Sequence, residues 1–326
     1  MNRTLPRALR ALAVAVFAAC ALAWPEAPAQ AQTAVKIGGL RTFPFLAVTH
    51  AAKQGYFKRE GLDVEVITVN SGPAVVSALM GGSVQVGYSA SLPPIFARAA
   101  NQPVRIFSQF SQETNKPDGS WTWLMATEKS GVKSAKDLAG KTVAINATGA
   151  LCELLVREHL AKAGVSWDAV KKIVVPFPQT QAALQLGNAD AACLIEPFRT
   201  SVKVAPEIRG VELGGGALAG TAPAYALDVL FVREDWGRAN MDTLKRINRG
   251  MEAALKDFRT QPGLLRRLIA EEFKLSPAAI SLMKYDMAFT ELRVGVEDVR
   301  PLLESLSRHK LLPAALRPED VILEVK

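Results

Sequence analysis

One segment of the chain occurs a second time, in degenerate form, further along the sequence. Residues 78–86 read ALMGGSVQV and residues 183–191 read ALQLGNADA, so Ala, Leu and Gly coincide and Gln85 corresponds to Asp190. Pro73 and Pro178 stand at the same offset before the two segments. The recurrence predicts one structural unit that is built twice, and this restricts the fold more than the composition does.

Around each segment the hydrophobic periodicity predicts the same order of elements, strand, helix, strand, helix, strand. In the first unit, strands are expected at 35–39, 62–69 and 84–88, and helices at 45–53 and 73–80. In the second unit, strands are expected at 142–146, 172–175 and 189–195, and helices at 150–163 and 179–186. Two βαβαβ units predict an α/β protein with mostly parallel sheets.

The remaining segments indicate how the two units are joined. Strands expected at 121–126 and 225–232 lie where the chain would pass between two lobes, so we expect both to act as hinges. Beyond residue 235, apolar residues spaced three and four apart predict a helical tail, with later helices at 264–273, 277–288 and 296–309. The expected lobes are residues 32–124 with 227–326, and residues 125–226 as an insertion between them.

Residues 1–31 have the pattern of a secretory signal peptide. Arg3, Arg7 and Arg10 precede an apolar run at 11–24, and Ala29-Gln30-Ala31 provides a small-x-small cleavage site. The run is shorter than the about 20 residues that a membrane span needs. We therefore expect cleavage after Ala31 and a periplasmic protein. Lipid attachment at Cys20 is less favoured, because Phe17 stands where a lipobox has an aliphatic residue.

The charge and the cysteines argue against several classes of function. The chain carries 39 Lys+Arg and 31 Asp+Glu, a net +8, of which residues 1–31 supply three Arg and one Glu. The other basic residues are scattered among acids, so nucleic acid is not an expected partner. Cys152 and Cys193 lack the spacing of redox or zinc motifs, and two buried thiols are favoured over a disulfide. The three His are far apart, so we expect no metal or cofactor.

The candidate binding residues follow the predicted strands, because ligands of such sheets bind beyond the carboxyl ends of the strands. Hydroxyl groups and free backbone N–H groups at helix starts can hold an anion, although the same residues also cap helices without a ligand. The candidates are Arg41, Thr42, Phe43, Ser71, Gly72, Ser89, Ser91, Trp121, Asn146, Thr148, Gly149, Glu196 and Tyr225. Ser71, Ser89 and Thr148, with Arg41, are expected to hold an anionic group. Glu196 is expected either to contact the ligand or to cap a helix.

Several segments resemble one known family. They are KIG at 36–38, AAKQGYFKREGLDVE at 51–65, VQVG at 84–87, DLAGKTVA at 137–144, and ADA at 189–191 leading to Glu196-Pro197. They are similar to the substrate-binding proteins of ABC transporters in the nitrate, sulfonate, taurine and thiamine-precursor (NMT1-like) group, over nearly all of the chain after residue 31. The resemblance implies a type II periplasmic-binding fold, with two βαβ-built lobes joined by two hinge strands.

The resemblance also implies a function: a monomer that captures a small solute, expected to be anionic and organic, in the cleft between its lobes and delivers it to an ABC permease. A pyrimidine or thiamine-precursor-like solute is the alternative, because Ile195 stands where sulfonate and taurine binders of this group often carry an aromatic residue. A sensor subunit would use the same cleft. An enzyme of the related pyrimidine-synthesising type is disfavoured, since the His and the Cys-rich segment of such enzymes are missing. No catalytic residue is expected.

Overall fold

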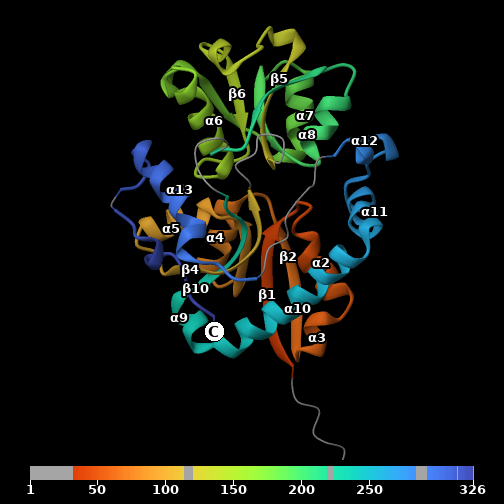
Figure 1. The fold of residues 1–326 in the computed structure, drawn as a ribbon, viewed down its shortest axis with the longest axis vertical. Helices are drawn as coiled ribbons and strands as arrows, with labels where there is room; N and C mark the ends of the chain where they lie inside the picture. The colour runs from red at the N-terminus through yellow and green to blue at the C-terminus, as the bar shows by residue number, and fades with distance from the viewer. Residues whose placement is uncertain (1–31, 114–119, 219–223, 284–291, 314, 326) are drawn as a thin grey trace, which may run out of the picture. The chain divides into compact units, whose positions relative to one another are not determined.

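The computed structural model describes residues 32–113, 120–218, 224–283, 292–313 and 315–325. These residues form two five-stranded sheets with helices against them (Figure 1). The α/β class and the helical C-terminal region are therefore confirmed. The signal peptide, the cleavage after Ala31 and Cys20 lie outside the described residues.

The first sheet has the strand order β2-β1-β3-β10-β4. Its strands are β1 (Thr33–Leu40), β2 (Leu62–Val69), β3 (Val86–Ala90), β4 (Val104–Glu113) and β10 (Tyr225–Arg233). β1 runs parallel to β2 and β3, whereas β10 runs antiparallel to β3 and β4. Half of the pairings are thus antiparallel, and the expectation of a mostly parallel sheet is wrong because the returning strand β10 enters the sheet from the opposite end.

The second sheet repeats this arrangement in the order β7-β6-β8-β5-β9. Its strands are β5 (Thr122–Thr127), β6 (Thr142–Ile145), β7 (Lys171–Val174), β8 (Ala191–Ile195) and β9 (Gly210–Gly215). β6 runs parallel to β7 and β8, and β5 runs antiparallel to β8 and β9. Each sheet therefore has a parallel βαβαβ unit extended by two further strands, and β4 and β9 are strands that the sequence pattern did not predict.

The repeated segment has the same hydrogen bonds in both sheets. The backbone N–H of Gln85 donates to Lys36 O at 3.0 Å, and the side chain of Gln85 accepts from Lys36 N at 2.9 Å. In the second sheet, Asp190 N donates to Thr142 O at 2.8 Å and the Asp190 carboxylate accepts from Thr142 N at 2.8 Å. Gln85 and Asp190 therefore occupy equivalent positions, as predicted: each lies just before a central strand and pairs with the neighbouring strand by one backbone and one side-chain hydrogen bond.

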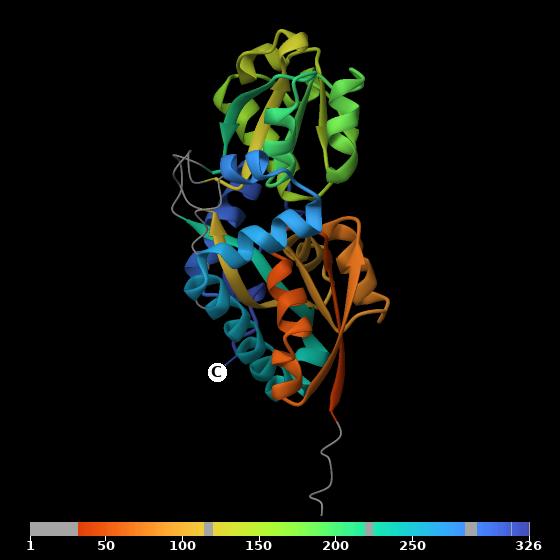
Figure 2. The ribbon, with the colours of Figure 1, turned by 90° about the vertical axis from the view of Figure 1, so that its right-hand side faces the viewer.

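Helices follow the strands of both units. They are α2 (Leu46–Lys53), α3 (Tyr56–Arg59), α4 (Gly72–Met80) and α5 (Leu92–Ala99) on the first sheet, and α6 (Leu151–Lys162), α7 (Phe177–Gln185) and α8 (Phe198–Val204) on the second. The C-terminal region contains α9 (Glu234–Ala239), α10 (Met241–Thr260), α11 (Pro262–Phe273), α12 (Pro277–Leu282) and α13 (Val296–Arg308). α10 packs against α2 and α3, beside which it runs in Figure 2, and α13 packs against β10.

The strands expected to be hinges each belong to one sheet. β5 lies between β8 and β9, and β10 lies between β3 and β4. The chain leaves the first sheet after Glu113 and joins the second at Thr122, then leaves the second after Gly215 and rejoins the first at Tyr225. The crossings between sheets thus precede β5 and β10, and the expected lobe boundary at residue 124 falls within β5.

A disulfide joins Cys152 at the start of α6 to Cys193 in β8, with the two Cα atoms 5.5 Å apart. The prediction of two free thiols is therefore wrong. The spacing of the two cysteines did not favour this pairing, because the bond arises where α6 packs over the middle of the second sheet.

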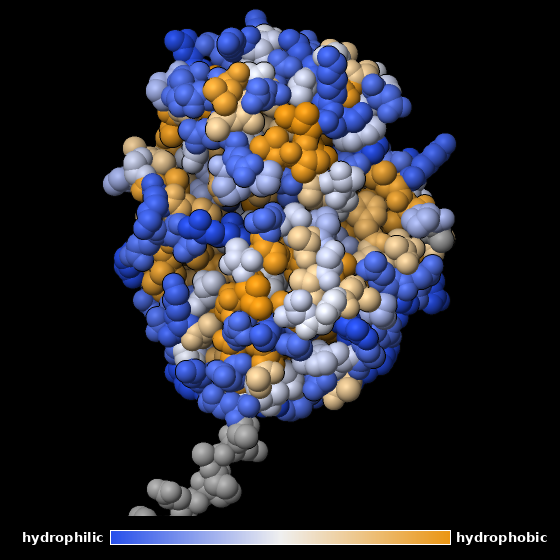
Figure 3. Space-filling view, turned by 180° about the vertical axis from the view of Figure 1, so that it is seen from behind, coloured by the Kyte–Doolittle hydropathy of each residue, from blue (hydrophilic) through white to orange (hydrophobic). Residues whose placement is uncertain are grey.

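The surface combines hydrophilic residues with separate apolar patches, as the face in Figure 3 shows. The helices within the described ranges include none that is long and apolar enough to cross a membrane. In the same ranges, no group of three or more His, Cys, Asp or Glu side chains is placed to hold a metal ion.

Candidate functional site

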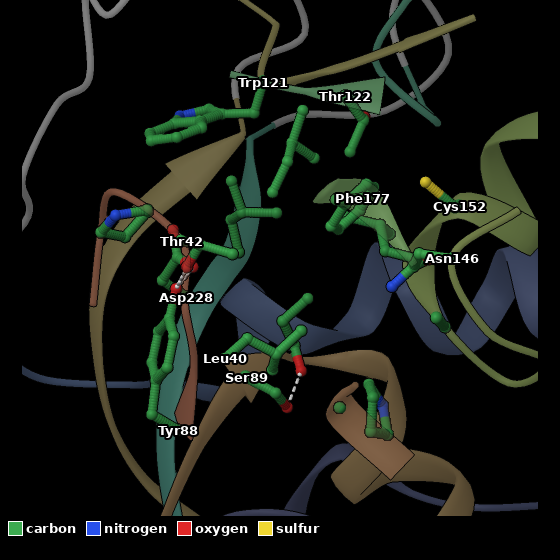
Figure 4. A pocket seen from close by; sticks show the side chains of 18 residues that line it. Leu40, Thr42, Tyr88, Ser89, Trp121, Thr122, Asn146, Cys152, Phe177 and Asp228 are labelled. Atoms are coloured by element: carbon green, nitrogen blue, oxygen red, sulfur yellow. Dashed lines mark hydrogen bonds between the residues drawn. The ribbon is translucent and has the colours of Figure 1, made fainter. Parts of the chain in front are cut away.

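A cavity lies where strand ends of both sheets meet (Figure 4). Its volume is about 60 Å³, several times the space that one water needs. The residues that line it are Leu40, Thr42, Pro44, Gly72, Tyr88, Ser89, Ala90, Pro93, Trp121, Thr122, Asn146, Ala150, Leu151, Cys152, Phe177, Ile195, Leu227 and Asp228. The carboxyl ends of β1, β3, β6 and β8 all contribute, as expected for ligand sites of such sheets.

A chain of hydroxyl groups leads to a buried carboxylate on one side of the cavity. The Thr42 hydroxyl lies 2.8 Å from the Tyr88 hydroxyl, which donates to Asp228 Oδ1 at 2.7 Å. The Ser111 hydroxyl donates to Asp228 Oδ2. Burial raises the pKa of Asp228 to about 6, although the hydrogen bonds from Ser111 and Tyr88 lower it. Asp228 is therefore largely ionised at neutral pH and can still accept a proton under mildly acidic conditions.

Asn146 follows β6 and lies across the cavity from Asp228 in Figure 4. Its side chain is 7% exposed, and its Oδ1 has no hydrogen-bond partner. An unsatisfied buried amide oxygen costs free energy comparable to a lost hydrogen bond. Asn146 places a polar side chain on an otherwise apolar side of the cavity.

The other walls of the cavity are apolar. The ring of Trp121 stacks on Phe43 with centroids 4.1 Å apart, so Phe43 supports Trp121 from behind without lining the cavity itself. Phe177 and Ile195 line the cavity from the second sheet and its helices, and Phe177 is supported in turn by Phe198 at 5.6 Å. These walls fit a small body with an apolar or aromatic face.

Five of the residues predicted from the sequence line this cavity: Thr42, Gly72, Ser89, Trp121 and Asn146. The Ser89 hydroxyl donates to Ala90 O at 2.6 Å, so its oxygen remains able to accept a further hydrogen bond. Gly72 lies close to its neighbours, since a Cβ there would come within 2.5 Å of Pro93. A side chain at residue 72 would therefore displace Pro93 in the wall.

The predicted anion site is not assembled. Ser71 caps α4 by accepting from Ala74 N at 3.3 Å, and Thr148 is exposed outside the cavity lining. Arg41 donates from Nε to Glu272 Oε1 and from Nη2 to Glu272 O, both at 2.6 Å. Arg41 instead lines a neighbouring groove, of about 250 Å³, that shares Leu40, Thr42 and Phe177 with the cavity. Only Ser89 of the four expected residues reaches the cavity.

The remaining predicted residues have structural contacts outside the cavity lining. Ser91 donates to Ala226 O at 2.7 Å, and Gly149 N donates to Glu153 Oε2 at 2.9 Å. The Tyr225 hydroxyl donates to the buried Glu113. Glu196 is fully buried and accepts from Arg199 Nη1 at 2.9 Å and from Thr200 N at 3.2 Å, so of its two expected roles it has the capping one.

Tyr88, Phe177 and Asp228 were missed by the sequence reasoning. Asp228 had a detectable signal, because it is the single acidic residue within the otherwise apolar strand 225–232. A charge in a buried strand needs partners, so such a residue is a candidate for a site. Tyr88 stands directly before Ser89 at the predicted end of a strand, where hydrophobic periodicity assigns it to the core.

Comparisons with known proteins agree with this architecture. A family model described as NMT1/THI5 like matches residues 43–263. A protein of Escherichia coli (strain K12) named for binding aliphatic sulfonates is 27% identical over 62% of this chain and 60% of its own length. The taurine-binding periplasmic protein of the same organism is 26% identical over 60% of this chain and 57% of its own length. The alignments thus span less than two thirds of either relative.

The fold recurs in solved structures. The alkanesulfonate-binding protein SsuA from Xanthomonas axonopodis pv. citri, bound to MOPS, matches with a TM-score of 0.76 at 17% identity, covering 90% of this chain and 98% of that chain. At this identity the match establishes the fold alone. It confirms the predicted periplasmic-binding fold.

Proposed function

The chain belongs to the NMT1/THI5-like family, and on that basis we propose that it is the solute-binding component of an ABC importer. In this role it captures a small organic solute in the cavity between its two sheets and delivers it to a membrane permease. The observation that carries the proposal is the cavity itself, which is lined from both sheets and combines apolar walls with a few buried polar groups.

The relatives support a binding role over a catalytic one, since those with the longer alignments are named as binding proteins. We further propose that the chain acts as a periplasmic monomer. Its lobes would be built on the two sheets and would close on the solute by a hinge at the strands 121–126 and 225–232, which correspond to β5 and β10.

The proposal is tested by identifying what the purified full-length chain carries. Denaturing the protein and analysing the released small molecules by mass spectrometry should yield a compound in stoichiometric amount. Adding that compound back at 100 times its Kd should stabilise the emptied protein by about 2.7 kcal/mol. Deleting the gene should then abolish uptake of the compound by the cell. Unchanged uptake would contradict the proposal that the protein delivers the compound to a permease.

A further inference from the structure

The charges around the cavity are negative. Asp228 is the charged side chain in its wall, and the described lining residues include no Lys, Arg or His. A second carboxylate lies directly behind the wall: Glu113 is fully buried and accepts from Trp121 N at 2.8 Å and from Thr122 N at 3.0 Å. The nearby cation Arg41 is held outside this wall by Glu272. A strong anion would therefore enter a buried site that contains a like charge and no counter-charge.

The polar groups of the wall are mostly acceptors. The Asp228 carboxylate receives one hydrogen bond from Tyr88 and one from Ser111, which leaves part of its acceptor capacity unused. Across the cavity, the buried Oδ1 of Asn146 lacks a donor. The Ser89 oxygen, whose proton is already donated to Ala90 O, is a further acceptor. The Asp228 carboxylate and the Ser89 oxygen thus offer acceptors to the cavity, and Asn146 adds an amide group on its opposite side.

From this arrangement, and resting on the proposed function, we infer that the cavity selects a neutral or positively charged nitrogen compound that presents an N–H donor to Asp228, in preference to a sulfonate or another strong anion. The apolar wall at Trp121 and Phe177 receives the planar or aliphatic body of that compound. Asp228 determines the preference for charge, and the Asn146 amide provides a further hydrogen-bonding group on the opposite side. This preference is the opposite of the anionic ligand that the hydroxyl groups at the strand ends predict.

The experiment compares probes that share a body and differ in their head group. Benzamidinium, neutral benzamide and benzenesulfonate, with acetamidinium and methanesulfonate as smaller equivalents, are titrated at millimolar concentrations into the full chain after its endogenous ligand has been removed. Binding is followed by thermal shift and by ligand-observed NMR. We expect benzamidinium or benzamide to bind at least tenfold more tightly than benzenesulfonate. The same difference is expected between acetamidinium and methanesulfonate.

Two substitutions assign the preference to residues. Asp228→Asn should weaken amidinium binding about tenfold or more and bring the sulfonate closer to it, because one charge-assisted hydrogen bond is lost. Asn146→Leu leaves the Asp228 hydrogen bonds intact and should weaken both nitrogen probes, so the test stands even if Asp228→Asn folds poorly. Asp235→Asn, in an exposed acid outside the cavity lining, is the matched control and should change none of these affinities.

The outcomes separate this inference from the proposed function. A sulfonate that binds as tightly as its matched amidinium, or a sulfonate released from the purified protein, overturns the inference and leaves a solute-binding protein. If no probe binds and no small molecule is released, the cavity is not a ligand site and both proposals fall. A released compound with N–H donors and no strong acid group, competing with benzamidinium, supports both.

Discussion

Glu196 belongs to a buried network of charges in the second lobe. Its carboxylate accepts from Arg199 Nη1, and the Arg199 guanidinium lies over the Trp123 ring, 4.4 Å from its centroid. Arg199 also pairs with Glu212. Because Arg199 is fully buried, removing one of its carboxylate partners leaves its positive charge only partly compensated.

Glu196→Ala should therefore lower the free energy of unfolding by about 3 kcal/mol. Ligand affinity should stay within about twofold, because Glu196 does not line the cavity. Urea denaturation and isothermal titration of the released ligand measure the two quantities. Glu212→Ala is the comparison on the more exposed side of Arg199, and a smaller loss is expected there. A variant that keeps its stability but loses affinity would indicate that Glu196 contacts the ligand.

His159 should make stability depend on pH. Burial, followed by the charge of Lys162, lowers the pKa of His159 to about 4, from an ordinary value of 6.5. The unfolded chain then takes up a proton near pH 6.5 and the folded chain only near pH 4. The free energy of unfolding should therefore fall as the pH falls through this window, by up to about 3 kcal/mol.

His159→Gln should remove this dependence. Asp228 acts in the opposite sense, because its raised pKa favours the folded state as the pH falls from about 6 towards 4. The difference in unfolding free energy between wild type and variant, measured at intervals from pH 7 to pH 4, isolates the His159 contribution. A difference that is constant with pH would show that His159 does not titrate in a buried environment.

Residues at helix starts illustrate what sequence reasoning can and cannot decide. Thr42, Ser89 and Asn146 line the cavity, and each follows a predicted strand of a repeated unit. Sequence reasoning could not separate them from Ser71 and Thr148, which follow strands in the same way. A hydroxyl that caps a helix and one that faces a ligand have the same chemistry, and only the packing of the opposite lobe distinguishes them.

At the scale of elements, the strands and helices of the repeat were predicted nearly to their ends, because each has a clear hydrophobic period. β4 was missed although it is almost wholly buried. Ser108, Gln109 and Ser111 interrupt its apolar run, and a strand buried on both faces loses the alternation by which exposed strands are recognised. One of these polar residues, Ser111, donates a hydrogen bond to Asp228. The same residue therefore interrupts the apolar pattern of the strand and supports the carboxylate at the cavity.

The disulfide fastens α6 to β8 and closes a loop with a sequence separation of 41 residues. The chain-entropy relation gives about 4 kcal/mol for a loop of this size. The double substitution Cys152→Ser, Cys193→Ser should lower the unfolding free energy by about that amount. Because Cys152 lines the cavity, affinity should fall as well. Melting curves with and without a reductant measure the effect.

The double variant is also the control for this experiment, since a reductant should lower the melting temperature of the wild type and leave that of the variant unchanged. Equal sensitivity of both proteins to reductant, or equal stability of both, would contradict a stabilising role for the bridge.

At the scale of the whole molecule, a second contact joins the lobes away from the cavity. Glu158 of α6, on the second sheet, is 5% exposed; it accepts hydrogen bonds from two residues of α13, on the first sheet, and lies near His309 at the end of that helix. The Ser305 hydroxyl donates to it, Arg308 Nη2 lies at 2.9 Å and His309 Nε2 at 3.3 Å. Burial raises the pKa of Glu158, but Ser305, Arg308 and His309 more than offset this, so its pKa is below the ordinary value. The same helix begins at the cavity wall with Leu151 and Cys152.

Glu158→Ala should therefore shift the molecule from a closed towards an open arrangement of its lobes, because polar contacts across the junction are replaced by water on opening. Small-angle scattering with saturating released ligand should give a compact wild type, and the variant should need about tenfold more ligand to reach the same radius of gyration. Glu304→Ala, an exposed acid on α13, should behave as wild type. If Glu158→Ala keeps wild-type affinity and compaction, the contact between α6 and α13 does not contribute to closure; if the wild type itself shows no compaction on binding, the lobes do not close by a hinge at all.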